Sequence, residues 1–257
     1  MKMLRIMALL SLLMLVVSCG GTKESTGASS SKGKKYIIAT DATYAPFEFQ
    51  ENGKYIGIDV DLITEIAKIE GFEFELKPMD FGGIIPALQS GQIDGAIAGA
   101  SITDERKKSV DFSDPYYETG IVAVTNTANT TIKTGKDLEG KKLAVKNGTA
   151  GAAYVEANLK GKAEVATFKD TVSMFQAVTN NQADAAFEDY PVIAYALSKD
   201  SASKLKIGTE KLTTGNYGFM VKKGENAELI TKFNEGLKKL KESGKYDEIV
   251  AKYVGKK

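Results

Sequence analysis

The chain alternates short apolar runs with stretches of helical periodicity from residue 36 onward, and this alternation constrains its fold most. Apolar runs bounded by turn residues predict strands, and apolar positions three or four apart predict helices. The predicted strands are 36–40, 72–76, 94–98, 142–145, 164–168 and 183–187. The predicted helices are 59–70, 83–90, 150–159, 171–180, 191–199, 227–242 and 246–254. Such alternation is typical of an α/β fold with largely parallel sheets.

One phrase of the sequence recurs after ninety residues. Residues 87–96 read ALQSGQIDGA, and residues 177–186 read AVTNNQADAA. Each phrase predicts the end of a helix, a turn and a strand of small residues. Two similar α/β lobes explain the recurrence most simply, and the alternative is a chance likeness between two common helix–turn–strand segments.

Polar residues and a glycine follow the predicted strands. Asp41 and Lys146 come after one type of strand, and Gly99 and Asp189 come after the other. Ligands of open α/β sheets bind at the carboxyl ends of the strands. These four residues therefore predict a binding site between two facing lobes.

The composition excludes several classes of function. The chain has no histidine and one cysteine, which excludes Ser-His-Asp and Cys-His catalysis, an intrachain disulfide and a cysteine metal cluster. Lys and Arg total 34 against 33 Asp and Glu, so the charge balance gives no electrostatic case for binding nucleic acid. We predict no metal and no cofactor.

The N-terminal segment predicts export and a lipid anchor. Residues 6–17 are apolar but for one serine and follow two basic residues, which is typical of a signal peptide and too short to span a membrane. The run ends in VVSCG, which resembles a bacterial lipobox with Cys19 as the lipidated residue. We expect a lipoprotein signal peptide over 1–18, a flexible tether over 19–35, and acyl chains such as palmitate on Cys19. The alternative is a plain secretory signal with an incidental cysteine.

The predicted location follows from this segment. The folded body would lie outside the cytoplasm, anchored to the cell membrane by lipid. A tether rich in Gly, Ser, Thr and Lys favours a Gram-positive surface over a Gram-negative periplasm.

Six segments together resemble the extracellular solute-binding proteins, family 3, of polar amino acid ABC transporters, and among these the glutamine-binding proteins. The segments are ATDATYAPFEF at 39–49, IGIDVDL at 56–62, PMDFGGIIPALQSGQIDGAIAG at 78–99, SITDERKKSVDFSDPYY at 101–117, LAVKNGT at 143–149 and YDEIVAKY at 246–253. The resemblance extends over nearly the whole body.

The resemblance implies a two-lobed periplasmic-binding-protein-like fold of type II, with central mixed, mostly parallel sheets and two hinge strands. Lobe one would comprise 36–119 and 218–257, and lobe two 124–213. The hinges would lie near 120–123 and 214–217. The family closes on its ligand by a hinge motion, and the closed form docks on the membrane permease. We expect a monomer.

The resemblance also implies how the backbone of an amino acid would be held. Arg106 would bind the α-carboxylate through its planar guanidinium, helped by the N–H groups of Ser101 and Ala150. Asp189 would balance the ammonium, with the Gly99 carbonyl and the Ser101 hydroxyl as further acceptors. The family usually has Thr at the first of these backbone donors and often Gly at the second. The alternatives are a solvated surface arginine in a charged run, and a helix N-cap role for the aspartate.

Four residues would surround the ligand side chain. Tyr44 and Phe81 match an aromatic pair that sandwiches it, and their alternative role is core packing. Asp41 could accept from an amide NH₂ and Lys146 could donate to its oxygen, so glutamine is favoured, with arginine or glutamate as alternatives. The alternative for this charged pair is an ion pair that merely joins the lobes.

Glu188 departs from the family pattern, since the glutamine-binding relatives carry His there. A carboxylate beside Asp189 helps a cationic ligand, unless it points away from the site. Glu188 is also the only candidate general acid for an enzyme such as a cyclohexadienyl dehydratase. Nothing else predicts catalysis, so we predict a binding protein and not an enzyme. The third class considered is an adhesin, which would require an exposed apolar patch.

Overall fold

The computed structural model describes residues 34–255. The predicted signal peptide and the lipidated Cys19 lie outside the described residues, as does nearly all of the predicted tether. Within 34–255, no helix has the length and apolar character needed to cross a membrane.

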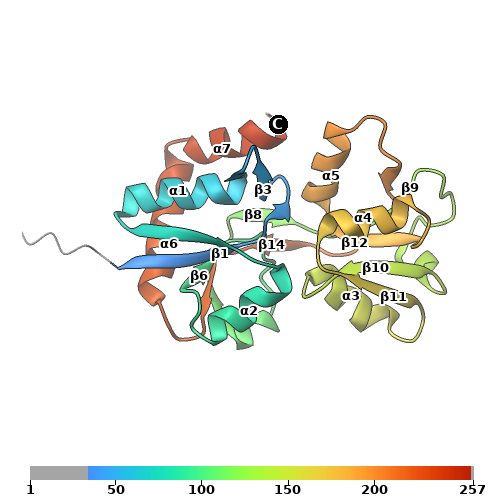
Figure 1. Ribbon diagram of the computed structural model, residues 1–257, viewed down its shortest axis with the longest axis horizontal. Coiled ribbons are helices and arrows are strands. Elements are labelled where there is room, and N and C mark those ends of the chain that lie inside the picture. Colours follow the sequence, from blue (N-terminus) through green and yellow to red (C-terminus); the bar gives the residue numbers. More distant parts are fainter. Residues whose placement is uncertain (1–33, 256–257) are drawn as a thin grey trace, which may run out of the picture. The chain divides into compact units, whose positions relative to one another are not determined.

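The first sheet, whose strands β1 and β6 are labelled in Figure 1, has five strands in the order β5-β1-β6-β15-β7. These strands are β1 (Lys35–Thr40), β5 (Glu73–Pro78), β6 (Gly95–Ala96), β7 (Val110–Phe112) and β15 (Met220–Lys222). The strand β1 runs parallel to both β5 and β6, whereas β15 runs antiparallel to β6 and β7. The sheet is therefore mixed, and its parallel part is built from the N-terminal third of the body.

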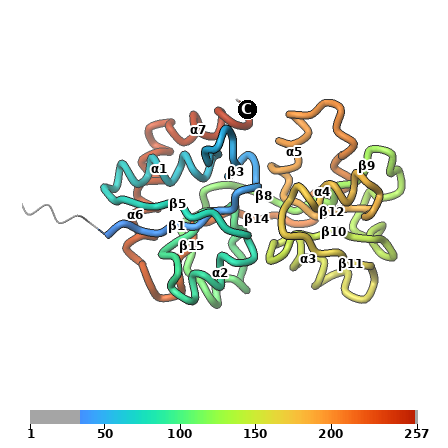
Figure 2. The backbone as a smooth tube through the Cα atoms, in the orientation of Figure 1, coloured from blue at the N-terminus to red at the C-terminus, as the bar shows by residue number. Residues whose placement is uncertain are grey.

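Four helices accompany the first sheet. They are α1 (Ile58–Glu70), α2 (Phe81–Gln89), α6 (Ala227–Glu242) and α7 (Lys245–Val254). The helices α1, α6 and α7 bury one cluster of apolar side chains, which includes Leu62 and Phe233. The helix α2 buries a second cluster with Ile84 and Leu88. Figure 2 shows the blue strand β1 and the red helices α6 and α7 in the same half of the body, so this lobe combines both ends of the body.

The second sheet has five strands in the order β11-β10-β12-β9-β13. These strands are β9 (Ile121–Asn126), β10 (Lys142–Lys146), β11 (Glu164–Phe168), β12 (Ala185–Asp189) and β13 (Leu205–Ile207). The strand β10 is parallel to its neighbours β11 and β12, and β9 is antiparallel to β12 and β13. Three helices, α3 (Ala150–Leu159), α4 (Thr171–Thr179) and α5 (Tyr190–Lys199), and the short 3₁₀ helix η2 (Gly135–Leu138) complete this half.

Short strands complete the structure. The strands β8 (Tyr117–Thr119) and β14 (Gly215–Tyr217) pair antiparallel where the chain passes from one sheet to the other and back. The strands β2 (Thr43–Tyr44), β3 (Glu48–Glu51) and β4 (Lys54–Ile56) form a small antiparallel sheet beside α1. Two five-stranded mixed sheets, each with helices, confirm the predicted α/β class with two sheet-bearing lobes.

The predicted helices and strands are all present, with shifted ends in places. The strand β6 has two residues, shorter than predicted, yet the N–H groups of Asp94 and Ile97 still donate to β1 on either side of it. The strand β12 starts two residues later than predicted because the N–H of Ala183 still donates to Ala177 in the turn that ends α4. It then extends to Asp189, since β9 pairs with it over this length.

Candidate functional site

The predicted strand-end residues come together at the edges of the two sheets. Asp41 directly follows β1, Lys146 ends β10, and Asp189 ends β12. Gly99 lies three residues beyond β6, and its backbone packs against the Tyr44 ring. The carboxyl ends of parallel strands from the two sheets therefore face each other here, as the sequence predicted.

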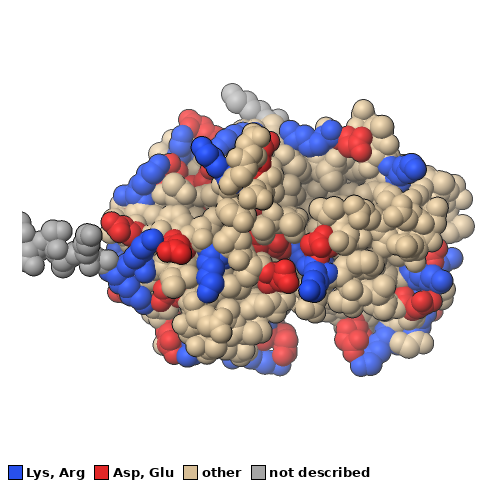
Figure 3. All heavy atoms as spheres, in the orientation of Figure 1, with Lys and Arg blue, Asp and Glu red and all other residues tan. Residues whose placement is uncertain are grey.

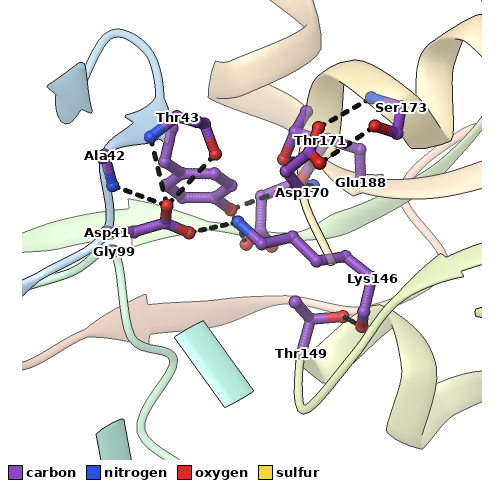
Figure 4. Close-up of polar contacts among 12 residues, drawn as sticks. Asp41, Ala42, Thr43, Gly99, Lys146, Thr149, Asp170, Thr171, Ser173 and Glu188 are labelled. Atoms are coloured by element: carbon purple, nitrogen blue, oxygen red, sulfur yellow. Dashed lines mark hydrogen bonds and ion pairs between the residues drawn. The ribbon is translucent and has the colours of Figure 1, made fainter. Parts of the chain in front are cut away.

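Asp41 and Lys146 form an ion pair between residues of the two sheets. The Lys146 ammonium donates to Oδ2 of Asp41, and the two side chains are only 2% and 6% exposed (Figure 4). The other Asp41 oxygen accepts from the N–H groups of Ala42 at 2.6 Å and Thr43 at 3.1 Å. Burying two charges carries a large desolvation cost, which their mutual attraction must offset. The ion pair considered as the alternative from sequence is therefore present.

Two aromatic rings flank this lysine. The ammonium of Lys146 lies 4.9 Å from the ring centre of Tyr44 and 5.7 Å from that of Phe81. Both distances are within the range of cation–π attraction. Tyr44 is buried and Phe81 is half-buried, so the Lys146 ammonium is in contact with two aromatic rings inside the protein.

Gly99 allows the Tyr44 ring to lie against the backbone. Its φ is +52°, and a Cβ built on it would lie 2.5 Å from Cε1 of Tyr44. Only glycine meets both requirements without strain. The Tyr44 hydroxyl donates to Asp189 at 2.6 Å and lies 3.2 Å from Glu188, so the ring spans from one lobe to the other.

Arg106 is buried, which contradicts the alternative of a solvated surface arginine. Its guanidinium donates to the Ser101 carbonyl at 2.7 Å and to the Gly148 carbonyl at 2.9 Å, and it lies 5.2 Å from the Phe81 ring centre. The Thr103 hydroxyl accepts from the Arg106 N–H at 3.2 Å, and Arg106 is the first residue and the buried one of the 3₁₀ turn η1 (Arg106–Lys108). Burial lowers the pKa of Arg106, and the nearby Asp189 charge opposes this shift.

The start of helix α3 lies beside the arginine. Ala150 is the first residue of α3, and the preceding Gly148 carbonyl accepts from Arg106. The first N–H groups of a helix have no partner within it, and the helix dipole attracts anions to this end. Arg106 and the N-terminus of α3 thus offer complementary charge and donors for a carboxylate. Ser101 is buried and forms a β-bridge with Tyr217.

Asp189 is buried at the end of β12. Its Oδ2 accepts from Tyr44, whereas its Oδ1 has no hydrogen-bond partner among residues 34–255. It stands at the N-cap position of α5 but makes no side-chain capping bond, which contradicts the structural alternative. Burial raises the pKa of Asp189, while the Tyr44 hydrogen bond and the Arg106 charge lower it.

Glu188 faces the same cluster. Its carboxylate accepts from the Thr171 hydroxyl at 3.1 Å and from the Asp189 N–H at 2.8 Å, in addition to its contact with Tyr44 (Figure 4). The possibility that it points away is therefore wrong. Burial, followed by the Asp189 charge, raises the pKa of Glu188 to about 7.

Some contributors to the site were not found from the sequence. Tyr217 on β14 places its hydroxyl 3.2 Å from that of Tyr44, and the Thr119 hydroxyl on β8 donates to it at 3.3 Å. Both residues belong to the paired crossing strands, whose pairing joins segments nearly a hundred residues apart. Two further carboxyl groups, Glu48 and Asp59, lie within the family-like segments 39–49 and 56–62. Both are buried, and the only sign of them in the sequence is an acidic residue among apolar neighbours.

The site residues are closely packed against one another. A cavity of about 280 Å³ opens beside Asp41, lined by Thr43, Asp80 and Asp170 among others. A second cavity, about 1250 Å³, lies elsewhere and is lined by residues of β8, α5 and α7. Arg106, Lys146 and Asp189 are all under 10% exposed.

Charge on the outer surface is mixed. Figure 3 shows Lys and Arg interspersed with Asp and Glu over the face in view, consistent with the nearly even charge balance. By contrast, five charged side chains are buried where the two lobes meet: Asp41, Arg106, Lys146, Glu188 and Asp189.

Comparison with known proteins agrees with the resemblance found from the motifs. The model of the bacterial extracellular solute-binding proteins, family 3, matches residues 36–256. A probable histidine-binding protein of Neisseria gonorrhoeae is 35% identical over 245 residues, covering 93% of this chain and 90% of that protein. An ancestral arginine-binding protein bound to arginine is 43% identical with a TM-score of 0.81, covering 86% of this chain and 98% of that one. The same kind of protein bound to glutamine is 42% identical with a TM-score of 0.80 and the same coverage.

Proposed function

From the premise that the chain belongs to the bacterial extracellular solute-binding proteins, family 3, we propose that it captures L-glutamine and delivers it to the permease of an ABC importer. The family binds amino acids outside the cytoplasm and works with ABC transporter permeases, and its members are not enzymes. Membership of the family therefore accounts for amino acid binding in general. The choice of amino acid has to be argued from the residues of the site.

The observation that carries the choice of glutamine is the buried Asp41–Lys146 pair between two aromatic rings. A primary amide offers two N–H donors and a carbonyl acceptor. Asp41 accepts from the amide nitrogen and Lys146 donates to the amide oxygen, while Tyr44 and Phe81 pack on the faces of the amide plane. A cationic side chain would meet Lys146 as a like charge in a desolvated space, which is unfavourable.

The backbone of the amino acid is proposed to bind at the other end of the site. Arg106 and the N–H groups of Ser101 and Ala150 take the carboxylate. Asp189, whose Oδ1 has no hydrogen-bond partner within 34–255, takes the ammonium together with the Gly99 carbonyl and the Ser101 hydroxyl. Complete hydrogen bonding of this kind is required to bury both charges of a zwitterion.

Arginine is a second candidate, and Glu188 is the observation that favours it. Three carboxylates (Asp41, Glu188 and Asp189) and two cations (Arg106 and Lys146) are buried here. A ligand with one net positive charge would balance the excess carboxylate. Ancestral proteins of similar sequence have been solved with arginine and with glutamine, so both ligand types suit related sites.

We also propose that ligand capture closes two lobes, 36–119 with 218–257 and 124–213, about hinges near 120–123 and 214–217. The burial of Arg106, Lys146 and Asp189 supports this, because a ligand could not reach them without a movement of the surrounding structure. Lipidation of Cys19 would hold the protein at the cell membrane as a monomeric receptor, on a Gram-positive surface in preference to a periplasm.

Calorimetric titration of the purified protein with glutamine, arginine, glutamate and asparagine tests the ligand. We expect glutamine to bind most tightly, and Lys146→Ala to weaken glutamine about tenfold or more while improving arginine. Lys142→Ala, at the exposed start of the same strand, is the matched control and should change nothing. Tighter binding of arginine, reduced by Glu188→Gln, would replace glutamine by the second candidate.

A further inference from the structure

Two carboxyl groups are fully buried beneath the proposed site. Glu48 on β3 and Asp59 in the first turn of α1 both have 0% exposure. Oδ2 of Asp59 accepts from the Gly99 N–H at 2.8 Å and from the Tyr116 hydroxyl at 2.7 Å. The other three carboxyl oxygens of the pair are buried without a donor among the described residues. None of the roles assigned above accounts for these two acids.

Backbone contacts connect the two acids to the ligand-binding residues. Glu48 pairs with Tyr44 across the β2–β3 hairpin, and the Asp59 N–H donates to the Phe47 carbonyl at 2.9 Å. Asp59 in turn holds the N–H of Gly99, against which the Tyr44 ring packs. Glu48 therefore lies next to the strand that carries Tyr44. Asp59 binds Gly99, the residue against which the Tyr44 ring packs.

Two ionised carboxylates cannot remain side by side without water or counter-charge. One proton between them would give a donor to Oδ1 of Asp59 and use one Glu48 oxygen, leaving a single oxygen unpartnered. Burial and the nearby Asp59 and Asp41 charges raise the pKa of Glu48 well above its usual value, against the opposing charge of Lys146. Burial raises the pKa of Asp59 to about 6, although hydrogen bonds from Tyr116, Gly99 and Glu48 oppose this. Asp59 already accepts two hydrogen bonds at Oδ2, whereas neither Glu48 oxygen accepts one from the described residues, so Glu48 is the member of the pair that keeps the proton.

We infer that Glu48 and Asp59 share one proton and act as positioning residues, fixing the Gly99 backbone and the Tyr44 ring in the geometry that receives an amino acid. The inference rests on the proposed function, because Gly99 and Tyr44 are assigned to the ligand there. In this arrangement Glu48 donates to Asp59, and the charged Asp59 accepts from Gly99 and Tyr116. Neither acid touches the ligand.

The pH dependence of stability tests the shared proton without any ligand. A carboxyl that stays protonated in the folded state favours folding at low pH, and this contribution is lost as pH rises above 4.5 toward its folded-state pKa. Glu48→Gln keeps the shape and a donor but has no proton to lose. We expect the ratio of the unfolding constants of wild type and Glu48→Gln to rise by up to about tenfold per pH unit between pH 5 and 7.

The exposed Glu51 on the same strand supplies the matched control, since Glu51→Gln should unfold in parallel with wild type at every pH. Parallel pH profiles for wild type and Glu48→Gln would overturn the shared proton.

Binding tests the positioning role. We expect Glu48→Gln to bind glutamine within about threefold of wild type, because its amide still donates to Asp59. Glu48→Leu leaves Asp59 without that donor, so it should weaken glutamine, asparagine and arginine alike by about tenfold or more. Equal binding by Glu48→Leu and wild type would overturn the positioning role. If the leucine variant does not fold, binding by Glu48→Gln that is more than about tenfold weaker than wild type would overturn the role instead.

The two proposals fail in different ways. If wild-type protein binds no amino acid, the proposed function fails, while the pH profiles of wild type and Glu48→Gln still decide on the shared proton. If wild type binds glutamine but the two pH profiles are parallel, the proposed function is supported and the shared proton is contradicted.

Discussion

Arg106 is the only one of three consecutive basic residues that is buried, and it contacts carbonyls on both lobes. Since every amino acid presents the same carboxylate, losing this guanidinium should affect all ligands equally. We expect Arg106→Ala to weaken glutamine and arginine by about a hundredfold or more, because two charge-assisted hydrogen bonds are lost. Isothermal titration calorimetry measures the change. The exposed neighbour Lys107 provides the control variant Lys107→Ala, and normal binding by Arg106→Ala would show that the carboxylate lies elsewhere.

The residues of the candidate site could be predicted in large part because strand ends have a fixed place in an α/β fold. Asp41, Lys146 and Asp189 meet as expected for that reason. Arg106 could be predicted only from the family-like segment 101–117, since a run of charged residues gives no sign that one of its side chains is buried. The orientation of Glu188 could not be predicted either, because its partners Tyr44 and Thr171 come from two other elements.

At the scale of elements, the turn after β6 is the most constrained connection in the site. Gly99 combines a positive φ with close contact to the Tyr44 ring, whereas Gly91 has a positive φ and open space within 4 Å of where a Cβ would lie. Alanine at Gly91 should therefore lose only the conformational term, about 1 kcal/mol of the free energy of unfolding. We expect Gly99→Ala to lose about 2–4 kcal/mol in chemical denaturation and also to weaken ligand binding, because Tyr44 must move. Equal losses for the two variants would show that the ring is free to shift.

Helices were predicted well because their periodicity lies within one segment. The ends of α3 and α6 agree with the prediction to the residue. The strand β9 was expected only as part of a hinge, yet it forms the centre of the second sheet's antiparallel part. Its partners, β12 and β13, lie about sixty to eighty residues later, and no local pattern can report a pairing of that length. The same holds for β8 with β14.

For the whole molecule, ligand binding and lobe closure should appear together as stabilisation. The contacts between the lobes include Asp41 with Lys146, Arg106 with Gly148, and Tyr44 with Asp189, and these are also proposed ligand contacts. A ligand at a thousand times its Kd stabilises the folded state by about 4 kcal/mol. We expect 1 mM glutamine to raise the Tm by several degrees in a thermal-shift measurement, and D-glutamine to serve as the control. No shift with any of the twenty L-amino acids would contradict amino acid capture by this chain.

The place of β15 in the first sheet has a consequence for the order in which the chain can become structured. All five strands of the second sheet come from one continuous stretch, 121–207, whereas β15 inserts between β6 and β7 only after residue 220 is available. As the polypeptide emerges vectorially, N-terminus first, the second lobe has its complete sheet while the first still lacks one of its inner strands. The lobe that begins the body is thus the last to be finished, and a chain ending before Met220 would leave β6 and β7 without the strand that joins them.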